Sequence, residues 1–214
     1  MCMKDIYASV AAATVWFPKD GGQGVLVNDS VDGRLIVTAA HCIGQVLNDE
    51  MMFGDLYPQT VQINERECTV RPLAVEPVAD IAIMGVLGDQ SSQDEEEAFL
   101  TFCAGIEPVP VCQNALEFGD EFPVHIYTHK AQWITGNASY YGGPSLRVAF
   151  DAEIEGGTSG GPIINDSGEL VGIVSIAENW TAQTSSGYTL TGFTEGSSPY
   201  PYLALPVWVS RRIL

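Results

Sequence analysis

One serine, Ser159, lies among four glycines in the segment EGGTSGGP, residues 155–162. Glycine adopts backbone conformations that are closed to other residues, and it lets the backbone approach a bound molecule closely. A serine hydroxyl becomes an effective nucleophile when a neighbouring base accepts its proton. The oxyanion formed on an attacked carbonyl then needs hydrogen-bond donors, which the N–H groups of Gly157 and Ser159 are placed to supply. The segment therefore indicates acyl-transfer chemistry, with a purely structural tight turn as the alternative.

A general base for this serine has to come from another part of the chain, which contains three histidines. His125 and His129 lie in the strand-like stretch VHIYTHK, which has no special turn chemistry. His41 follows an apolar stretch, and the small residues Ala39 and Ala40 leave open space beside it. Many histidines are plain structural residues, but this setting favours His41 as the base.

The remaining polar candidate, Asp80, immediately precedes the apolar run IAIMGV. Most of the other acidic residues lie in predicted loops. An acidic side chain amid apolar sequence needs a partner. That partner is either backbone at the start of the strand or an imidazole, whose tautomer a buried carboxylate fixes and whose cation it stabilises.

The elements that must position these residues are mostly short strands. Apolar or alternating runs recur along the chain with turn residues between them, which is typical of an antiparallel sandwich or barrel. Residues 15–17 are expected to form the first of these strands. Helical periodicity is scarce: we expect one or two helical turns in AAHCIGQVL, residues 39–47, and a short C-terminal helix at residues 205–214.

The stretch GDQSSQDEEEAF, residues 88–99, is polar and acidic, which predicts a solvated loop. About six predicted strands precede it and about six follow it. We therefore expect an N-terminal half at residues 1–100, carrying the histidine and the aspartate, and a C-terminal half at residues 101–214, carrying the serine. No sequence repeat relates the halves, so this division depends on the strand count alone.

Taken together, TAAHC around His41, DIAIM at Asp80 and GTSGGP at Ser159 resemble the three signature motifs of the chymotrypsin-like (trypsin-fold) serine peptidases, in the same chain order. The resemblance covers nearly the whole chain. The segments GQGVLVN, FDAEIEGGTSGGPIIN and YLALPVWV are similar to the bacterial HtrA-like and V8-like branch of that family. The resemblance implies an all-β fold of two six-stranded antiparallel β-barrels, with the site in the crevice between them.

The same resemblance implies a role for each residue. Ser159 attacks the scissile carbonyl, His41 acts as general base and then as general acid, and Asp80 orients His41. The N–H groups of Gly157 and Ser159 form the oxyanion hole. The implied function is that of a serine endopeptidase, with a polypeptide substrate and with neither a cofactor nor a metal.

Several features depart from the chymotrypsin branch. The residue before the serine is Thr158, which carries no charge to pair with an amine freed by zymogen cleavage. The chain lacks an Ile-Val-Gly-Gly start, and Cys42 has no cysteine on the preceding strand to pair with. A PDZ domain, usual after HtrA proteases, is not expected here. We therefore expect activity without N-terminal cleavage, controlled by loops, a regulatory domain or a partner protein.

The pocket for the residue before the cut is expected between the segment leading to the serine and a later strand. By the resemblance, Glu153 stands where the trypsin-like pattern holds its specificity acid, and Ser175, Ile176 and Ala177 match the opposite wall. A carboxylate at the base of the pocket favours Lys or Arg before the cut. Two alternatives stay open: strand alternation is also consistent with Glu153 facing water, and the HtrA-like branch often prefers small aliphatic residues.

The charge of the chain argues against some classes of partner. Its 214 residues include 27 acidic and 9 basic ones, for a net charge of −18. Such a field repels nucleic acid and anionic membranes, and it either serves solubility or attracts cationic substrates. No apolar run reaches the roughly 18 residues of a membrane span. We expect neither nucleic acid nor a membrane as a partner.

The cysteines are few and irregularly spaced, at Cys2, Cys42, Cys68, Cys103 and Cys112. An odd number without C-x-x-C spacing argues against a zinc site and against a disulfide scaffold. Cys103 and Cys112 either pair with each other or stay as free thiols.

The N-terminal segment has no small-residue cleavage site of a signal peptide, which favours the cytoplasm. Secretion is the alternative, because N-x-Ser/Thr sequons begin at Asn28, Asn137, Asn165 and Asn179. Two of these, Asn28 and Asn165, lie where hairpin turns are expected, and turns select Asn, Asp and Ser for conformational reasons as well.

Two other classes of function compete with a peptidase. One is a catalytically inactive binding module on the same fold, although inactive relatives usually lose one of the three residues that this chain keeps. The other is a different acyl-transfer hydrolase such as an esterase. An α/β-hydrolase needs helices that alternate with its strands, and helical periodicity is scarce here.

Overall fold

The computed structural model of the chain describes most residues, including the three predicted catalytic positions. The described residues are 2–19, 21–28, 33–43, 52–53, 58–76, 79–86, 92–142, 146–150, 152, 154, 156–177, 181–183, 189–191 and 202–206. Side chains are described throughout these ranges except at 52–53, 176–177, 181–183, 189–191 and 202–206.

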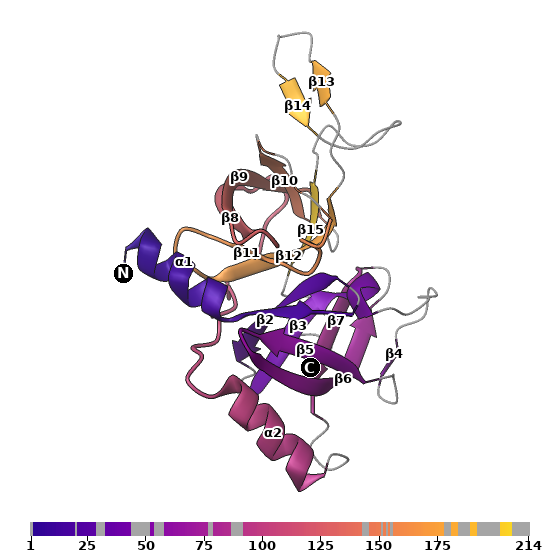
Figure 1. Ribbon diagram of the computed structural model, residues 1–214. Coiled ribbons are helices and arrows are strands. Elements are labelled where there is room, and N and C mark those ends of the chain that lie inside the picture. The colour runs from indigo at the N-terminus through magenta and orange to yellow at the C-terminus, as the bar shows by residue number, and fades with distance from the viewer. Residues whose placement is uncertain are drawn as a thin grey trace.

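The chain consists mainly of antiparallel strands arranged in two bodies, with few helices (Figure 1). The helices are α1 (Met3–Ala12), the 3₁₀-helix η1 (Ala40–Ile43) and α2 (Gln93–Cys103). The strands of the N-terminal half are β1 (Thr14–Phe17), β2 (Gly22–Asn28), β3 (Arg34–Ala39), β4 (Met52–Phe53), β5 (Gln59–Ile63), β6 (Arg66–Glu76) and β7 (Ile81–Gly85). Those of the C-terminal half are β8 (Glu121–Tyr127), β9 (Trp133–Tyr140), β10 (Leu146–Phe150), β11 (Pro162–Ile164), β12 (Leu170–Ala177), β13 (Thr181–Gln183), β14 (Thr189–Thr191) and β15 (Tyr202–Pro206).

The first sheet closes on itself because its longest strand pairs with both ends of the series. Its strands follow the order β4-β6-β5-β1-β2-β3-β7, and β6 also pairs with β7. The first part of β6 pairs with β5 and the part from Arg71 to Glu76 pairs with β7. The register shifts between Pro72 and Ala74, and such an irregularity bends a strand. Six strands thereby form a ring, to which the short β4 is added.

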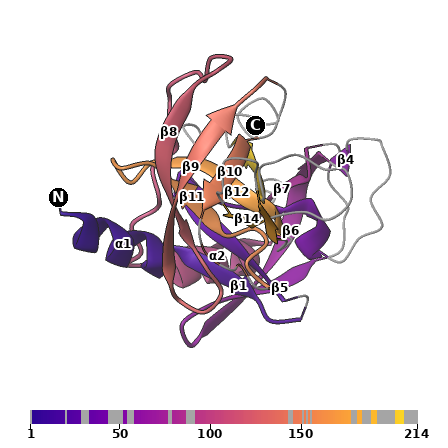
Figure 2. The ribbon, with the colours of Figure 1, turned by 90° about the horizontal axis from the view of Figure 1, so that it is seen from above.

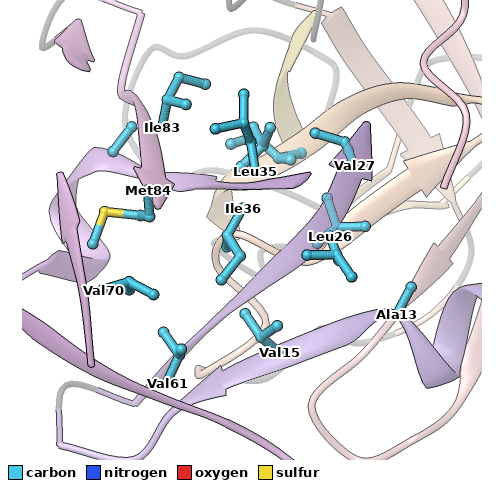
Figure 3. Packing of buried hydrophobic residues seen from close by; sticks show 14 of the residues in the cluster. Ala13, Val15, Leu26, Val27, Leu35, Ile36, Val61, Val70, Ile83 and Met84 are labelled. Carbon is cyan, nitrogen blue, oxygen red and sulfur yellow. The ribbon is translucent and has the colours of Figure 1, made fainter. Parts of the chain in front are cut away.

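Aliphatic side chains fill the interior of this first barrel. Strands β5 and β6 alternate between buried and more exposed residues, as expected where one face meets the core and the other meets water. Figure 3 shows Val15, Ile36, Val61 and Val70 gathered inside. By contrast, β2 is buried at every position except its last, so neither of its faces meets water.

The second half forms a closed barrel of six strands in the order β10-β15-β12-β11-β8-β9. This confirms the predicted all-β fold of two antiparallel barrels. Among the described residues, strands β13 and β14 pair with each other alone, and they project away from this barrel (Figure 1). The turn that carries Ser159 lies between β10 and β11.

The helix α1 precedes the first strand and was not predicted from the sequence. Its buried residues, Ile6 and Val10, are one turn apart and join the core of the first barrel. On the other side, the ring of Tyr7 stacks on Trp133 with centroids 4.2 Å apart, and its hydroxyl lies 2.9 Å from Nδ1 of His125 on β8. The helix therefore contacts both barrels, and it lies close to β8 in the view from above (Figure 2).

The prediction that residues 88–99 form a solvated loop is wrong from Gln93 onward, where α2 begins. Ser92 caps this helix: its hydroxyl accepts the N–H of Glu95, and the Glu95 carboxylate accepts the N–H of Ser92. Phe99 and two residues of the last turn are buried against the first barrel. Helix α2 runs through residues 100 and 101, where the division into two halves was placed; that division stays a prediction.

Other expectations have mixed outcomes. The helical turn after residue 39 is confirmed by η1, while residues 44–47 lie outside the described residues. The C-terminal helix is wrong at residues 205–206, which belong to β15, and residues 207–214 lie outside the described part. All five cysteines are free thiols, so Cys103 and Cys112 do not pair. Among the described residues, no helix is long and apolar enough to cross a membrane.

Candidate active site

Strand pairing in the first barrel brings His41 next to Asp80. Strand β3 ends at Ala39, which pairs with Ile81 at the start of β7. The chain turns into η1 directly after β3, so His41 lies beside the residue that precedes β7. The Asp80 carbonyl accepts the N–H of Ala40 at 2.9 Å, which fixes the two segments to each other. Asp80 has a φ of +53°, in the left-handed region, which aspartate tolerates better than most residues.

The Asp80 carboxylate holds His41 through two contacts. Its Oδ2 lies 2.8 Å from Nδ1 of the imidazole, and its Oδ1 accepts the backbone N–H of His41 at 3.0 Å. The side chain of His41 is 45% exposed and that of Asp80 is 20% exposed, so the ring faces solvent while the carboxylate lies behind it. The hydrogen bond to Asp80, with a smaller contribution from Cys42, raises the pKa of His41 above its ordinary value of 6.5.

A third donor reaches the same carboxylate from the second barrel. The hydroxyl of Ser175 on β12 donates to Oδ2 of Asp80 at 2.5 Å, and Ser175 is only 4% exposed. The sequence assigned Ser175 to the wall of a substrate pocket and gave no sign of this contact. Its neighbour in that prediction, Ile176, belongs to β12, but its side chain is not described.

The turn that carries Ser159 requires glycine at two positions for definite reasons. Gly160 has a φ of +78°, and a Cβ there would lie 1.9 Å from the carbonyl oxygen of Gln23. Gly157 has a φ of +94°, and a Cβ there would lie 3.1 Å from the carbonyl oxygen of Gly21. The turn is therefore packed directly against the start of β2, and this close packing explains why both positions are glycine.

Backbone carbonyls engage the N–H groups of the last two glycines of this turn. The N–H of Gly160 donates to Val174 at 2.6 Å, and that of Gly161 donates to the Thr158 carbonyl at 2.9 Å. Within the described part of the chain, the N–H groups of Gly157 and Ser159 donate to no carbonyl. These are the two groups that the resemblance assigns to an oxyanion hole.

Ser159 is placed near the histidine through the backbone of β2. The N–H of Gln23 donates to the Ser159 carbonyl at 2.7 Å. A Cβ on the preceding residue, Gly22, would lie 2.5 Å from Sγ of Cys42 and 3.4 Å from the Ser159 carbonyl oxygen, so β2 passes between the serine turn and η1. No hydrogen bond links the Ser159 hydroxyl to His41 among the described residues.

Thr158, directly before the serine, is fully buried. Its hydroxyl oxygen lies 3.2 Å from Nδ1 of His129 and accepts the backbone N–H of His129 at 3.4 Å. The sequence treated His129 as an ordinary strand histidine. In the structure His129 lies in the turn after β8 and supports the buried side of the serine turn.

Part of the predicted specificity pocket lies outside the described residues. Glu153 lies outside the described residues, although its neighbour Ile154 is buried. Ala177 ends β12, and nothing is described of its side chain. Within the described ranges, no group of three or more His, Cys, Asp and Glu side chains is arranged to hold a metal ion.

Comparison with known proteins agrees with this fold. No curated protein matches the chain significantly. The fold is similar to that of the serine endoprotease from Yersinia pestis (TM-score 0.55, 16% identity), over 99% of this chain and 65% of that one. It is also similar to the inactive form of the Rv3671c protease (TM-score 0.52, 16% identity), over 98% of this chain and 90% of that one. An inactive serine-to-alanine mutant of Rv3671c from M. tuberculosis gives a TM-score of 0.51 at 14% identity, over 97% of this chain and 87% of that one.

A sequence match covers the site as well as the fold. Residues 22–173 match the trypsin-like peptidase domain. The matched region is more than half of the chain and includes His41, Asp80 and Ser159. The chain therefore belongs to the trypsin-like peptidase family.

Proposed function

We propose that this chain is a serine endopeptidase in which Ser159, His41 and Asp80 form the catalytic triad. Membership of the trypsin-like peptidase family supports a peptidase. The observation that carries the proposal is the 2.8 Å contact between His41 Nδ1 and Asp80 Oδ2. A carboxylate at Nδ1 keeps the proton on that nitrogen, so Nε2 is the atom that accepts a proton from the nucleophile.

The proposed reaction begins when Nε2 of His41 takes the hydroxyl proton of Ser159 while Oγ attacks the substrate carbonyl carbon. The electron pair of the carbonyl bond moves to its oxygen, which the N–H groups of Gly157 and Ser159 stabilise. Collapse of this intermediate breaks the C–N bond, and the leaving amine takes the proton from His41. Water then hydrolyses the acyl-enzyme by the same steps.

The hydrogen bond between Ser159 and His41 belongs to the substrate complex in this proposal. Contacts between catalytic groups are often long before substrate binds and shorten in the complex. The ring of His41 is 45% exposed, which leaves it room to adjust toward the serine turn when substrate binds.

Activity without N-terminal cleavage forms part of the proposal. In the chymotrypsin branch, the residue before the serine is a carboxylate that pairs with a newly freed amine. Here Thr158 fills this position, and its hydroxyl is already hydrogen-bonded to His129. The serine turn is therefore supported by the turn that follows β8 in the second barrel.

The substrate class is a polypeptide, and the residue before the cut is proposed to be Lys or Arg, with Glu153 as its partner. The net charge of −18 favours the approach of cationic peptides. A peptide-library profile of wild type and Glu153→Ala tests this. Cleavage after Ala or Val in the wild type, or an unchanged profile in the variant, refutes the preference for Lys or Arg. Neither result bears on the assignment of the triad.

The triad is tested with a fluorophosphonate probe, which reacts with activated serines. The wild type is expected to be labelled, whereas Ser159→Ala is expected to stay unlabelled although folded. Ser167→Ala, which alters an exposed serine of the same barrel, serves as the matched control and should label normally. A folded wild type that neither labels nor cleaves peptides would identify the chain as an inactive binding module.

A further inference from the structure

Below the serine turn lies a buried amide that the proposed mechanism does not use. The side chain of Gln23, on β2, is fully buried at 0% exposure. Among the residues that the structure describes, neither its Oε1 nor its Nε2 has a hydrogen-bond partner. An amide removed from water without a partner is unfavourable, so a fully buried glutamine on a strand requires an explanation.

The backbone of Gln23 is already part of the serine turn. Its N–H donates to the Ser159 carbonyl at 2.7 Å, and its own carbonyl accepts the hydroxyl of Thr38 at 2.6 Å. That carbonyl is also the atom 1.9 Å from the position where a Cβ of Gly160 would stand. The backbone N–H and carbonyl of this residue are therefore both in direct contact with the turn, at Ser159 and Gly160.

The Gln23 side chain ends beside the next residue of the same turn. A Cβ on Gly161 would lie 2.7 Å from Oε1 of Gln23, 2.8 Å from the Thr158 carbonyl oxygen and 2.9 Å from the Tyr127 carbonyl oxygen. Three oxygen atoms thus surround one point, and all three are acceptors. Rotation of the terminal amide by 180° replaces Oε1 with Nε2, which is a donor of nearly the same size.

We propose that Gln23 is a positioning residue whose side-chain N–H group donates to the Thr158 carbonyl and thereby fixes the direction of the Ser159 N–H. The Thr158 carbonyl and the Ser159 N–H belong to one planar peptide group and point in opposite directions. A donor that holds the carbonyl inside the molecule therefore holds the N–H toward the crevice. The Thr158 carbonyl has a second lone pair for this bond, beside the one that accepts the N–H of Gly161.

This inference rests on the proposed function, because the Ser159 N–H matters only if an oxyanion forms there. It assigns to Gln23 no contact with substrate. Its consequence is specific: loss of the amide should weaken binding of a tetrahedral species and leave binding of the ground-state peptide unchanged.

The test compares Gln23→Met, which keeps the length of the side chain and removes the donor, with Gln62→Met on β5 as the control. Gln62 donates to the Asn64 carbonyl, away from the serine turn. For Gln23→Met, kcat is expected to fall about tenfold or more, since a misdirected oxyanion donor is lost only in part. KM should stay near the wild-type value. The affinity for a peptide aldehyde, which forms a tetrahedral adduct with the serine, should fall by the same factor as kcat, whereas the affinity for the corresponding peptide alcohol should not change.

If kcat and the affinity for the aldehyde are unchanged in Gln23→Met, the proposal is wrong. It is also wrong if KM rises and the variant loses affinity for the aldehyde and the alcohol equally, because a residue that only packs against the turn would have that effect. If this variant does not fold, the wild type decides by NMR. A scalar coupling across the hydrogen bond between the Gln23 side-chain nitrogen and the Thr158 carbonyl carbon is expected, and its absence contradicts the proposal. A wild type without peptidase activity would refute the proposed function, while the coupling would still test the position of the amide.

Discussion

The hydroxyl of Ser175 donates to Oδ2 of Asp80, the same oxygen atom that contacts the His41 ring. Ser175 belongs to β12 of the second barrel, and Asp80 precedes β7 of the first, so this hydrogen bond joins the two barrels at the site. With the backbone N–H of His41 on Oδ1, donors hold both oxygens of the carboxylate. The orientation of the imidazole thus depends on contacts from both halves of the chain.

Ser175→Ala is predicted to lower the free energy of unfolding by about 2 kcal/mol, because a hydrogen bond to a partly buried charged group is lost. A reduction of kcat by a few-fold should accompany it, with KM unchanged, since Asp80 keeps its two contacts with His41. Urea unfolding and steady-state kinetics measure the two effects. Ser139→Ala, at a buried serine of β9, is the control, and equal kcat in the two variants would contradict the prediction.

Ser159→Ala and His41→Ala are each predicted to remove nearly all peptide hydrolysis while the protein stays folded. Residues of a triad act as a unit, so the double variant should be little slower than either single variant. Kinetics with a fluorogenic peptide and circular dichroism provide the comparison. Strictly multiplicative losses, or substantial activity in His41→Ala, would exclude His41 as the base.

The pH dependence follows from the raised pKa of His41. The hydrogen bond to Asp80 favours the protonated imidazole and raises the pKa of His41 above 6.5. Because only the neutral ring accepts a proton, kcat/KM should rise with pH along a limb that lies above pH 6.5. In Asp80→Asn this limb should move to lower pH, and the plateau should fall by about 10⁴-fold because the tautomer is no longer fixed.

The raised pKa of His41 also predicts how the stability of the folded state depends on pH. A histidine with a raised pKa in the folded state stabilises that state fully below the unfolded value of 6.5, and this contribution is lost as pH rises through the folded value. The difference in thermal midpoint between wild type and His41→Ala should therefore shrink on going from pH 6 toward alkaline pH. A constant difference would show that Asp80 does not favour the protonated ring.

Alanine substitution at two glycines with nearly equal φ distinguishes the cost of backbone strain from the cost of steric overlap. Gly105 has a φ of +76° with open space around it, and Gly160 has a φ of +78° with the Gln23 carbonyl in the way of a Cβ. Gly105→Ala should cost about 1–2 kcal/mol, the usual penalty of a left-handed residue. Gly160→Ala should cost more than about 4 kcal/mol or prevent folding. Thermal unfolding of both variants tests this, and similar losses would show that the serine turn moves freely away from β2.

Tyr7→Phe isolates the hydrogen bond between α1 and the second barrel. The variant keeps the stack on Trp133 and loses the hydroxyl beside His125, so the free energy of unfolding should fall by about 1 kcal/mol. Tyr7→Ala should lose more, because the stacked ring is removed as well. If urea unfolding gives the same stability for Tyr7→Phe and the wild type, the hydrogen bond to His125 in the folded state is no more favourable than the hydrogen bonds that the hydroxyl makes to water in the unfolded state.

The barrels could be predicted from the spacing of the strands, and the three candidate catalytic residues could be proposed because each leaves a local trace in the sequence. His41, Asp80 and Ser159 all stand where a strand begins or a turn follows, and the glycines around Ser159 are unusual in composition. Helix α2 left a trace that was missed: Ser92 and Glu95 have the spacing of a capping box, and Phe99 and Phe102 continue the helix beyond the acidic run. Composition alone hid the helix, because four of its first five residues are acidic and read as a solvated loop.

The contacts of Ser175, Gln23 and His129 could not be predicted in this way. Each is an ordinary polar residue in or beside a strand, and alternation along a strand does not say which distant segment its side chain meets. Ser175 meets a residue 95 positions away. Only the packing of one barrel on the other determines such a pair.

Helix α1 limits how this molecule can regulate itself. Its C-terminal end is fixed to the first barrel, where the N–H of Leu26 donates to the Ala13 carbonyl at 2.9 Å, and Ile6 packs against the β11–β12 turn at Gly168, where a Cβ would lie 2.8 Å from it. A rigid-body rotation that moved the two barrels apart would have to break these contacts and those of Tyr7 together. Access to the nucleophile is therefore expected to change through local loop rearrangements rather than through separation of the two barrels.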